Sequence, residues 1–152
     1  MDIMALCDLV RQTAYDIHAY HGPGHLEKPY ENALVHRLRK AGLSVEQQFP
    51  ITIYDEDGTV IGEYIADLLV EGELIAELKA VKALAPEHVA QVMGYLKSAR
   101  KIHGLLINFG AHHFQIRKFA WDPNFKKGTV SGGGVVSSLF FTVSSLLYML
   151  TR

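Results

Sequence analysis

The chain has 152 residues, of which 49% are hydrophobic and 20% are charged, so it can bury the core of one domain and does not resemble a disordered chain. Its single cysteine excludes an internal disulfide and a zinc site built from several cysteines, and its first residues lack the basic segment of a signal peptide, from which we expect a cytoplasmic location. With a formal net charge of −1, the chain lacks the excess of basic residues that is typical of nucleic-acid-binding proteins. Carboxylates gathered at a metal site would, however, lower the net charge without changing the rest of the surface.

Two helices are predicted in the first third of the chain. Apolar residues recur at steps of three and four over residues 3–17, and the stretch 21–24, with its two glycines and a proline, ends that helix. A second helix starts near Glu27 or Pro29 and ends at Ala41, with Gly42 as its C-terminal cap. Its inward-facing residues are Tyr30, Ala33, Leu34 and Leu38.

Strand patterns dominate the middle of the chain. Residues 49–54 alternate between apolar and polar side chains and lead into a turn, and residues 60–70 and 74–80 form a second predicted hairpin. Pro86 opens a third helix, because a proline at the first helical position loses no hydrogen bond. Two further strands are predicted at 103–109 and 113–119. The order ααβββαββ predicts an α/β fold in which helices flank a mixed five-stranded sheet.

The C-terminal part of the sequence differs in composition from the rest. The predicted domain covers residues 1–121, a basic and glycine-rich linker covers 122–134, and an apolar tail covers 135–152. The uncharged stretch of the tail is shorter than the roughly 20 residues that span a bilayer, so a membrane partner is not expected. A packing helix, an oligomer contact and an out-of-frame C-terminus stay open as alternatives for the tail, and a membrane anchor is the least favoured.

Three ionisable residues, Asp67, Glu77 and Lys79, interrupt the predicted second hairpin. The stretches around them are apolar enough to be buried, where an isolated charge is costly. Two carboxylates on neighbouring strands repel each other unless a cation lies between them, and Mg²⁺, with Mn²⁺ as its substitute, prefers oxygen ligands. Such an ion would activate a water for attack on a phosphate, and Lys79 would orient that water. The alternative is a structural salt bridge between Glu77 and Lys79, but the aspartate on the facing strand favours a metal site.

Whether these side chains meet depends on the turn between the two strands. If Val70 pairs with Leu74 across a three-residue turn, with Gly72 at positive φ, then Asp67 lies directly opposite Glu77. The lysine two residues further on shares their face, because side chains alternate along a strand. A two-residue turn would instead place the aspartate and the glutamate on opposite faces of the sheet.

This arrangement resembles a known family. The pattern Asp67…Glu77-Leu78-Lys79 is similar to the core of the PD-(D/E)XK nuclease superfamily, with Ala66 where that superfamily has a proline. The stretch 24–30, Gly-His-Leu-Glu-Lys-Pro-Tyr, resembles the signature of the bacterial GxxExxY proteins, and the similarity extends over residues 22–121. The resemblance implies a restriction-endonuclease-like core and metal-dependent cleavage of nucleic acid.

The resemblance also implies further site residues. Superfamily members add a glutamate from the helix before the sheet, which is Glu31 or Glu27 here, with Glu31 favoured at the metal and Glu27 close by. The alternative for either is an acid that stabilises the helix start through its dipole. Gln91 and Tyr95 resemble the Gln-x-x-x-Tyr motif of RecB-like nucleases, which implies that Gln91 holds the catalytic lysine or a phosphate and that Tyr95 contacts the DNA backbone. Without the family, the same two residues would form a half-buried helix face. Tyr30 of the signature is carried over as a second substrate contact.

The favoured function is a Mg²⁺-dependent endonuclease that acts on DNA, with RNA less favoured, in DNA repair or processing. Its expected catalytic residues are Lys79, Glu77, Asp67 and Gln91, its partner is nucleic acid, and a homodimer is a further option. The competing hypothesis is a catalytically inactive nuclease-fold protein that binds nucleic acid or acts in an assembly. The near-neutral net charge favours this alternative, whereas the presence of both carboxylates and the lysine argues against it.

Overall fold

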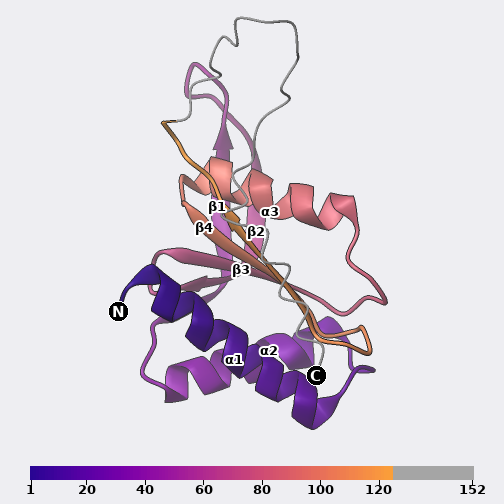
Figure 1. The fold of residues 1–152 in the computed structure, drawn as a ribbon. Coiled ribbons are helices and arrows are strands. Elements are labelled where there is room, and N and C mark those ends of the chain that lie inside the picture. Colours follow the sequence, from indigo (N-terminus) through magenta and orange to yellow (C-terminus); the bar gives the residue numbers. More distant parts are fainter. Residues whose placement is uncertain (125–152) are drawn as a thin grey trace, which may run out of the picture.

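The computed structural model describes residues 1–124 (Figure 1). The predicted element order ααβββαββ is confirmed. The predicted linker from residue 125 onward and the predicted apolar tail at 135–152 lie outside the described residues. Within residues 1–124, no helix is both long and apolar enough to cross a bilayer. In chain order the elements are α1 (Ile3–His21), α2 (Glu27–Lys40), β1 (Val45–Tyr54), β2 (Val60–Val70), β3 (Leu74–Lys79), α3 (Pro86–Ala99), β4 (His103–Asn108) and β5 (Gln115–Ala120).

The five strands form one mixed sheet in the order β1-β2-β3-β4-β5. The pairs β1–β2, β2–β3 and β4–β5 are antiparallel, and β3–β4 is parallel. A parallel pair needs a long crossover, and α3 supplies it between β3 and β4. The expectation of a mixed five-stranded sheet flanked by helices is therefore confirmed.

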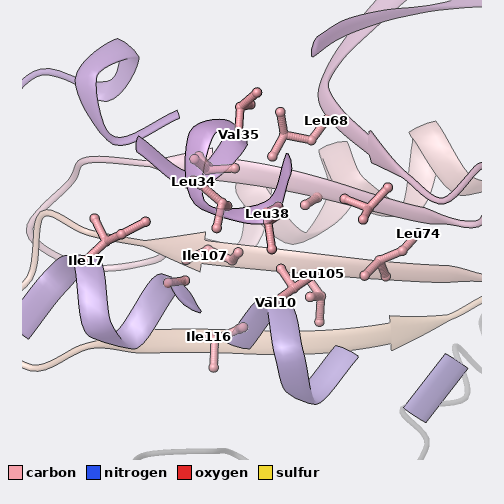
Figure 2. Close-up of a cluster of buried hydrophobic side chains, with 14 of the residues drawn as sticks. Val10, Ile17, Leu34, Val35, Leu38, Leu68, Leu74, Leu105, Ile107 and Ile116 are labelled. Carbon is pink, nitrogen blue, oxygen red and sulfur yellow. The ribbon is translucent and has the colours of Figure 1, made fainter. Parts of the chain in front are cut away.

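The helices cover both faces of the sheet: α1 and α2 lie on one face and α3 lies on the other (Figure 1). Alternate residues of the central strands serve the two sides, so Leu68 and Ala76 pack with α1 and α2, whereas Leu69 and Ile75 pack with α3. Burial of each leucine or isoleucine side chain among them contributes roughly 1.5–3 kcal/mol. Figure 2 shows the α1/α2 side of the core, with the labelled residues Val10, Ile17, Leu34, Val35, Leu38, Leu68, Leu74, Leu105, Ile107 and Ile116.

Local signals at the helix ends explain how α2 reaches the centre of the sheet. The side chain of Asp2 caps α1 by accepting a hydrogen bond from the Ala5 N–H at 2.9 Å. Helix α1 ends at Gly22, where φ is 67°, and the chain leaves α2 through Gly42, where φ is 89°. Both values lie in the left-handed region that glycine adopts without a Cβ clash. The reversal after Gly22 lets α2 pack beside α1 and against β1 and β3.

Candidate active site

The β2–β3 turn has the geometry on which the predicted site depends. Val70 pairs with Leu74 across the three residues 71–73, and Gly72 adopts a φ of 68°. The predicted turn and register are confirmed. Continued along the two strands, this register places Asp67 opposite Glu77.

At that position side chains take over the hydrogen bonding between the two strands. The Leu78 N–H donates to Asp67 Oδ2 at 2.8 Å, and the Asp67 N–H donates to Glu77 Oε2 at 3.2 Å. Both carboxyl groups are buried, with residue exposures of 8% for Asp67 and 4% for Glu77. One oxygen of each carboxyl group is thus held by the strand backbone. The other oxygens, Asp67 Oδ1 and Glu77 Oε1, have only longer side-chain contacts, to Gln48 at 3.5 Å and to Lys79 at 3.9 Å.

Lys79 lies beside this pair at the end of β3. Its Nζ is 3.9 Å from Glu77 Oε1, and its side chain is 15% exposed. Its backbone is held by β4, because the Phe109 N–H donates to the Lys79 carbonyl oxygen at 2.8 Å. The structure therefore brings together Asp67, Glu77 and Lys79 as the sequence predicts, while their chemical roles stay a prediction.

Asn108 fixes the chain just beyond the lysine. Its Oδ1 accepts hydrogen bonds from the N–H groups of Val81 and Gly110, both at 3.0 Å, and its Nδ2 donates to the Val81 carbonyl oxygen at 2.9 Å. Gly110 lies so close that a Cβ there would come within 2.4 Å of the Ala80 carbonyl carbon and the Val81 nitrogen. Asn108 is fully buried with its amide satisfied, so it aligns the segment that carries the ammonium group.

Glu31 reaches the pair of carboxylates from α2 and is bound by three side chains. Its exposure is 1%; its Oε2 accepts from Lys28 Nζ at 2.7 Å and from Gln47 Nε2, and its Oε1 accepts from Gln48 Nε2 at 2.8 Å. The same Gln48 amide lies 3.5 Å from Asp67 Oδ1. Gln48 therefore connects the helix glutamate to the strand aspartate.

Gln47 and Gln48 are absent from the predicted site. Gln48 also has a φ of 56°, an unusual value for a residue with a side chain, and the β1–β2 pairing passes from Gln47↔Leu68 to Phe49↔Ala66 around it. Two adjacent amides just before the predicted strand at 49–54 were the only sequence signal for them.

Glu27 lies one helical turn before Glu31 and is half-buried. Burial raises the pKa of the Glu27 carboxyl group, and the nearby Asp67 charge raises it further. Both glutamates are thus near Asp67, but Glu31 is the one bound into its hydrogen-bond network.

The carboxyl groups of Asp67 and Glu77 ionise less readily than exposed ones. Burial raises the pKa of Glu77 to about 8, with the neighbouring Asp67 charge as the second cause. Burial also raises the pKa of Asp67; the hydrogen bond from the Leu78 N–H opposes this rise, and the Glu31 charge adds to it. A bound cation would relieve both effects, since it favours the ionised carboxylates.

The carboxylates fit a divalent ion with few protein ligands. Within residues 1–124, no three His, Cys, Asp or Glu side chains are arranged as a complete ligand set. Mg²⁺ is commonly held by one or two carboxylates together with several waters and a substrate phosphate, so Asp67 and Glu77 suffice as protein ligands for it.

Gln91 and Tyr95 lie on one face of α3, as their spacing predicts. Gln91 Nε2 donates to the Tyr95 hydroxyl oxygen at 2.8 Å. Tyr95 is 5% exposed, and burial, followed by the charge of Glu77, raises its pKa to about 12. The pair therefore borders the carboxylates, with the hydroxyl group already bound to Gln91.

Tyr30 lies in the core, which differs from the expectation that it contacts substrate. Its exposure is 1%, its ring stacks on Phe109 with a centroid distance of 4.8 Å, and its hydroxyl group donates to the Gly22 carbonyl oxygen. A side chain enclosed in this way presents no surface to a substrate. Its position instead anchors the segment between α1 and α2.

Comparison with known proteins agrees with this geometry. The sequence matches the family profile described as the PD-(D/E)XK nuclease superfamily over residues 4–119, which includes every element from α2 to β4 and most of α1 and β5. Neither the curated proteins nor the solved structures contain a match to the chain. The family match covers more than half of the chain and contains the hairpin on which Asp67, Glu77 and Lys79 meet. The chain belongs to the PD-(D/E)XK nuclease superfamily.

Proposed function

We propose that this protein is a Mg²⁺-dependent phosphodiesterase that cuts DNA and belongs to the GxxExxY group of the RecB-like branch. The observation that carries the proposal is the convergence of two buried carboxylates, Asp67 and Glu77, with the ammonium group of Lys79 3.9 Å from the glutamate. Such a set can hold a divalent ion and place a positive charge beside a phosphate. DNA is proposed over RNA because Gln91 and Tyr95 resemble the motif of RecB-like nucleases.

Asp67 and Glu77 would hold the ion through the oxygens that the strand backbone leaves free, Asp67 Oδ1 and Glu77 Oε1. When bound, the ion supplies charge neutralisation at the phosphate and lowers the pKa of a water. Glu31 is held by Lys28 and Gln48, so we propose that it and Glu27 complete the acidic surroundings. The raised pKa values of Glu77 and Asp67 support this assignment, because burial disfavours their ionised forms and a bound cation would favour them.

The remaining residues of the site act through hydrogen bonds. Lys79 Nζ donates to the attacking water or to a phosphate oxygen, and the Asn108 contacts keep its strand end in place. Tyr95, with a pKa of about 12, keeps its proton at neutral pH and acts as a hydrogen-bond donor rather than as a base. Gln91 orients this hydroxyl group and offers its amide oxygen to the lysine or to water.

The test is a cleavage assay with purified protein over single-stranded, duplex and branched DNA and RNA, in Mg²⁺ and in Mn²⁺. The wild type is expected to cleave at least one DNA substrate, and Lys79→Ala is expected to reduce the rate about 100-fold or more, a typical loss for a donor that stabilises developing charge. Lys82→Ala, an exposed lysine beyond the strand end, is the matched control and should cleave normally. Wild-type protein that is folded and cleaves none of these substrates would refute the proposal. Light scattering of the same sample determines whether the cutting form is a homodimer.

A second candidate is a nuclease-fold protein that binds nucleic acid without cutting it. The observation that favours it is that, in the part of the chain that the structure describes, Asp67 and Glu77 lack a third protein ligand, while Glu31 is paired with Lys28. Calorimetry with Mn²⁺ separates the two candidates. The nuclease should bind Mn²⁺ and lose that binding in Asp67→Asn, whereas the binding protein should show no Mn²⁺ uptake that depends on Asp67.

A further inference from the structure

A groove beside α2 adjoins the carboxylate site but belongs to none of its proposed roles. Its volume is about 530 Å³, and the buried Val35 forms part of its lining. We call it the α2 groove; its lining residues are Asn32, Val35, His36, Arg39, Lys40 and Gln47.

The charge of the α2 groove suits a polyanion. Its ionisable lining residues, His36, Arg39 and Lys40, are all basic and all exposed. The nearest carboxyl group of α2, that of Glu31, is buried and covered by Lys28 and the two glutamines. Cations in the last turn also stabilise a helix through its dipole, but the dipole does not explain a hollow lined by them.

Gln47 joins the α2 groove to the site. Its Nε2 donates to Glu31 Oε2 and also to Asn32 Oδ1, the latter at 2.8 Å. One residue therefore contacts the acidic set on one side and lines the groove on the other. A ligand that contacts Gln47 in the groove is therefore one side chain away from the Glu31 carboxylate.

The length of the path corresponds to a short run of nucleic-acid backbone. From Glu31 to Lys40, α2 rises about 13 Å at roughly 1.5 Å per residue. That distance spans about four phosphates of one strand at roughly 3.4 Å each along a duplex axis. We propose that the α2 groove binds the phosphate backbone of the strand that is cut, about four nucleotides from the scissile phosphate. This inference rests on the proposed nuclease function, and it adds a backbone-binding track on α2 to that function.

The test measures nucleic-acid binding separately from phosphodiester hydrolysis. His36→Glu/Lys40→Glu reverses the charge at two of the three basic residues that line the groove. It leaves intact Arg39, whose guanidinium group donates to the Val45 carbonyl oxygen. Lys97→Glu on α3, which lies on the opposite face of the sheet, is the matched control (Figure 1). Binding to duplex oligonucleotides of increasing length is measured by fluorescence anisotropy over a series of salt concentrations. Hydrolysis of the small phosphodiester bis(p-nitrophenyl) phosphate, which is too short to reach the groove, is measured in parallel.

The double variant should bind a long oligonucleotide about tenfold more weakly than the wild type. The slope of the logarithm of the binding constant against the logarithm of the salt concentration should become shallower by about one for each phosphate that the groove no longer binds. The weaker binding should appear only for oligonucleotides long enough to extend about four nucleotides from the site, and hydrolysis of the small phosphodiester should be unchanged. Equal binding by the double variant and the wild type, or equally weakened binding by Lys97→Glu, would overturn the inference. The binding measurement needs no turnover, so a wild type that binds through the groove without cutting would refute the nuclease function and leave the groove assignment supported.

Discussion

Replacing Glu77 by glutamine should make the metal-free protein more stable at alkaline pH while abolishing its metal-dependent activity. The pKa of Glu77 is raised from an ordinary 4.5 to about 8, chiefly because the group is buried. A folded-state pKa above the unfolded one means that the folded protein binds more protons between these two values. The contribution of Glu77 to the free energy of unfolding is therefore fully present below about pH 4.5, and it is lost as the pH rises through about 8.

The magnitude follows from the same shift. At about 1.4 kcal/mol per pKa unit, ionising Glu77 in the folded protein costs on the order of 3–5 kcal/mol above pH 8. Glu77→Gln removes that cost because the amide stays neutral, and its oxygen can still accept the Asp67 N–H. The variant should gain stability of this order at pH 8.5 and almost none at pH 4.5. Glu63→Gln, on an exposed part of β2, is the control and should change stability by less than about 0.5 kcal/mol at either pH.

Urea unfolding at both pH values, with and without Mg²⁺, measures the effect through the transition midpoint at constant m-value. Mg²⁺ at about 100 times its Kd should stabilise the wild type by roughly 2.7 kcal/mol and should not stabilise Glu77→Gln. If Glu77→Gln is no more stable than the wild type at pH 8.5, the carboxylate carries no unfavourable charge in the folded protein, and the electrostatic argument for a cation fails.

Three further outcomes follow from the contacts around the site. Asn108→Leu should destabilise the protein by about 2–4 kcal/mol in urea unfolding, because it leaves buried backbone groups near Val81 without hydrogen bonds, and it should lower the cleavage rate by displacing the strand end. Gly110→Ala should lose several kcal/mol of stability or fail to fold, because its Cβ would lie 2.4 Å from backbone atoms. Gly94→Ala, whose Cβ would have its nearest neighbour at 3.9 Å, should gain up to about 1 kcal/mol of stability from helix propensity. Thermal unfolding compares the two variants. Tyr30→Phe should cost about 1 kcal/mol of stability and leave KM and kcat unchanged, and a raised KM would restore the assignment of Tyr30 as a substrate contact.

The central hairpin could be predicted from sequence because its determinants are local. A three-residue turn containing Gly72, flanked by apolar strands, allows one register that buries both strands, and that register places Asp67 opposite Glu77. The helical period of α2 also predicts correctly that Tyr30 faces inward together with Leu34, since both lie in the core. The family signature contains the same tyrosine, but a signature does not distinguish a core residue from one that contacts substrate.

The glutamine bridge could not be predicted, because the β1–β2 register changes along the strands. Tyr54 pairs with Val60, and from that pair a regular ladder would place Gln47 opposite Asp67. A register shift between Ile53 and Tyr54 moves the pairing by one residue, so Gln48 takes that place instead. The extra residue at this shift is Ile61 of β2, and the adjacent Gly62 indicates a bulge there but does not indicate which glutamine the bulge brings opposite Asp67.

The apolar residues of the hairpin determine where its charges lie. At Asp67 and Glu77 the side chains bind the backbone N–H groups of the opposite strands, so the carboxylates themselves contribute to the pairing there. A slip of one residue would turn Asp67 towards the α1/α2 face, where Leu34 and Leu38 are fully buried, and would cost several kcal/mol for an unpaired buried charge. The packing on both faces therefore selects the one register in which the carboxylates and Lys79 meet. Substitutions in the core on either side of β2 should consequently change the geometry of the site before they unfold the domain.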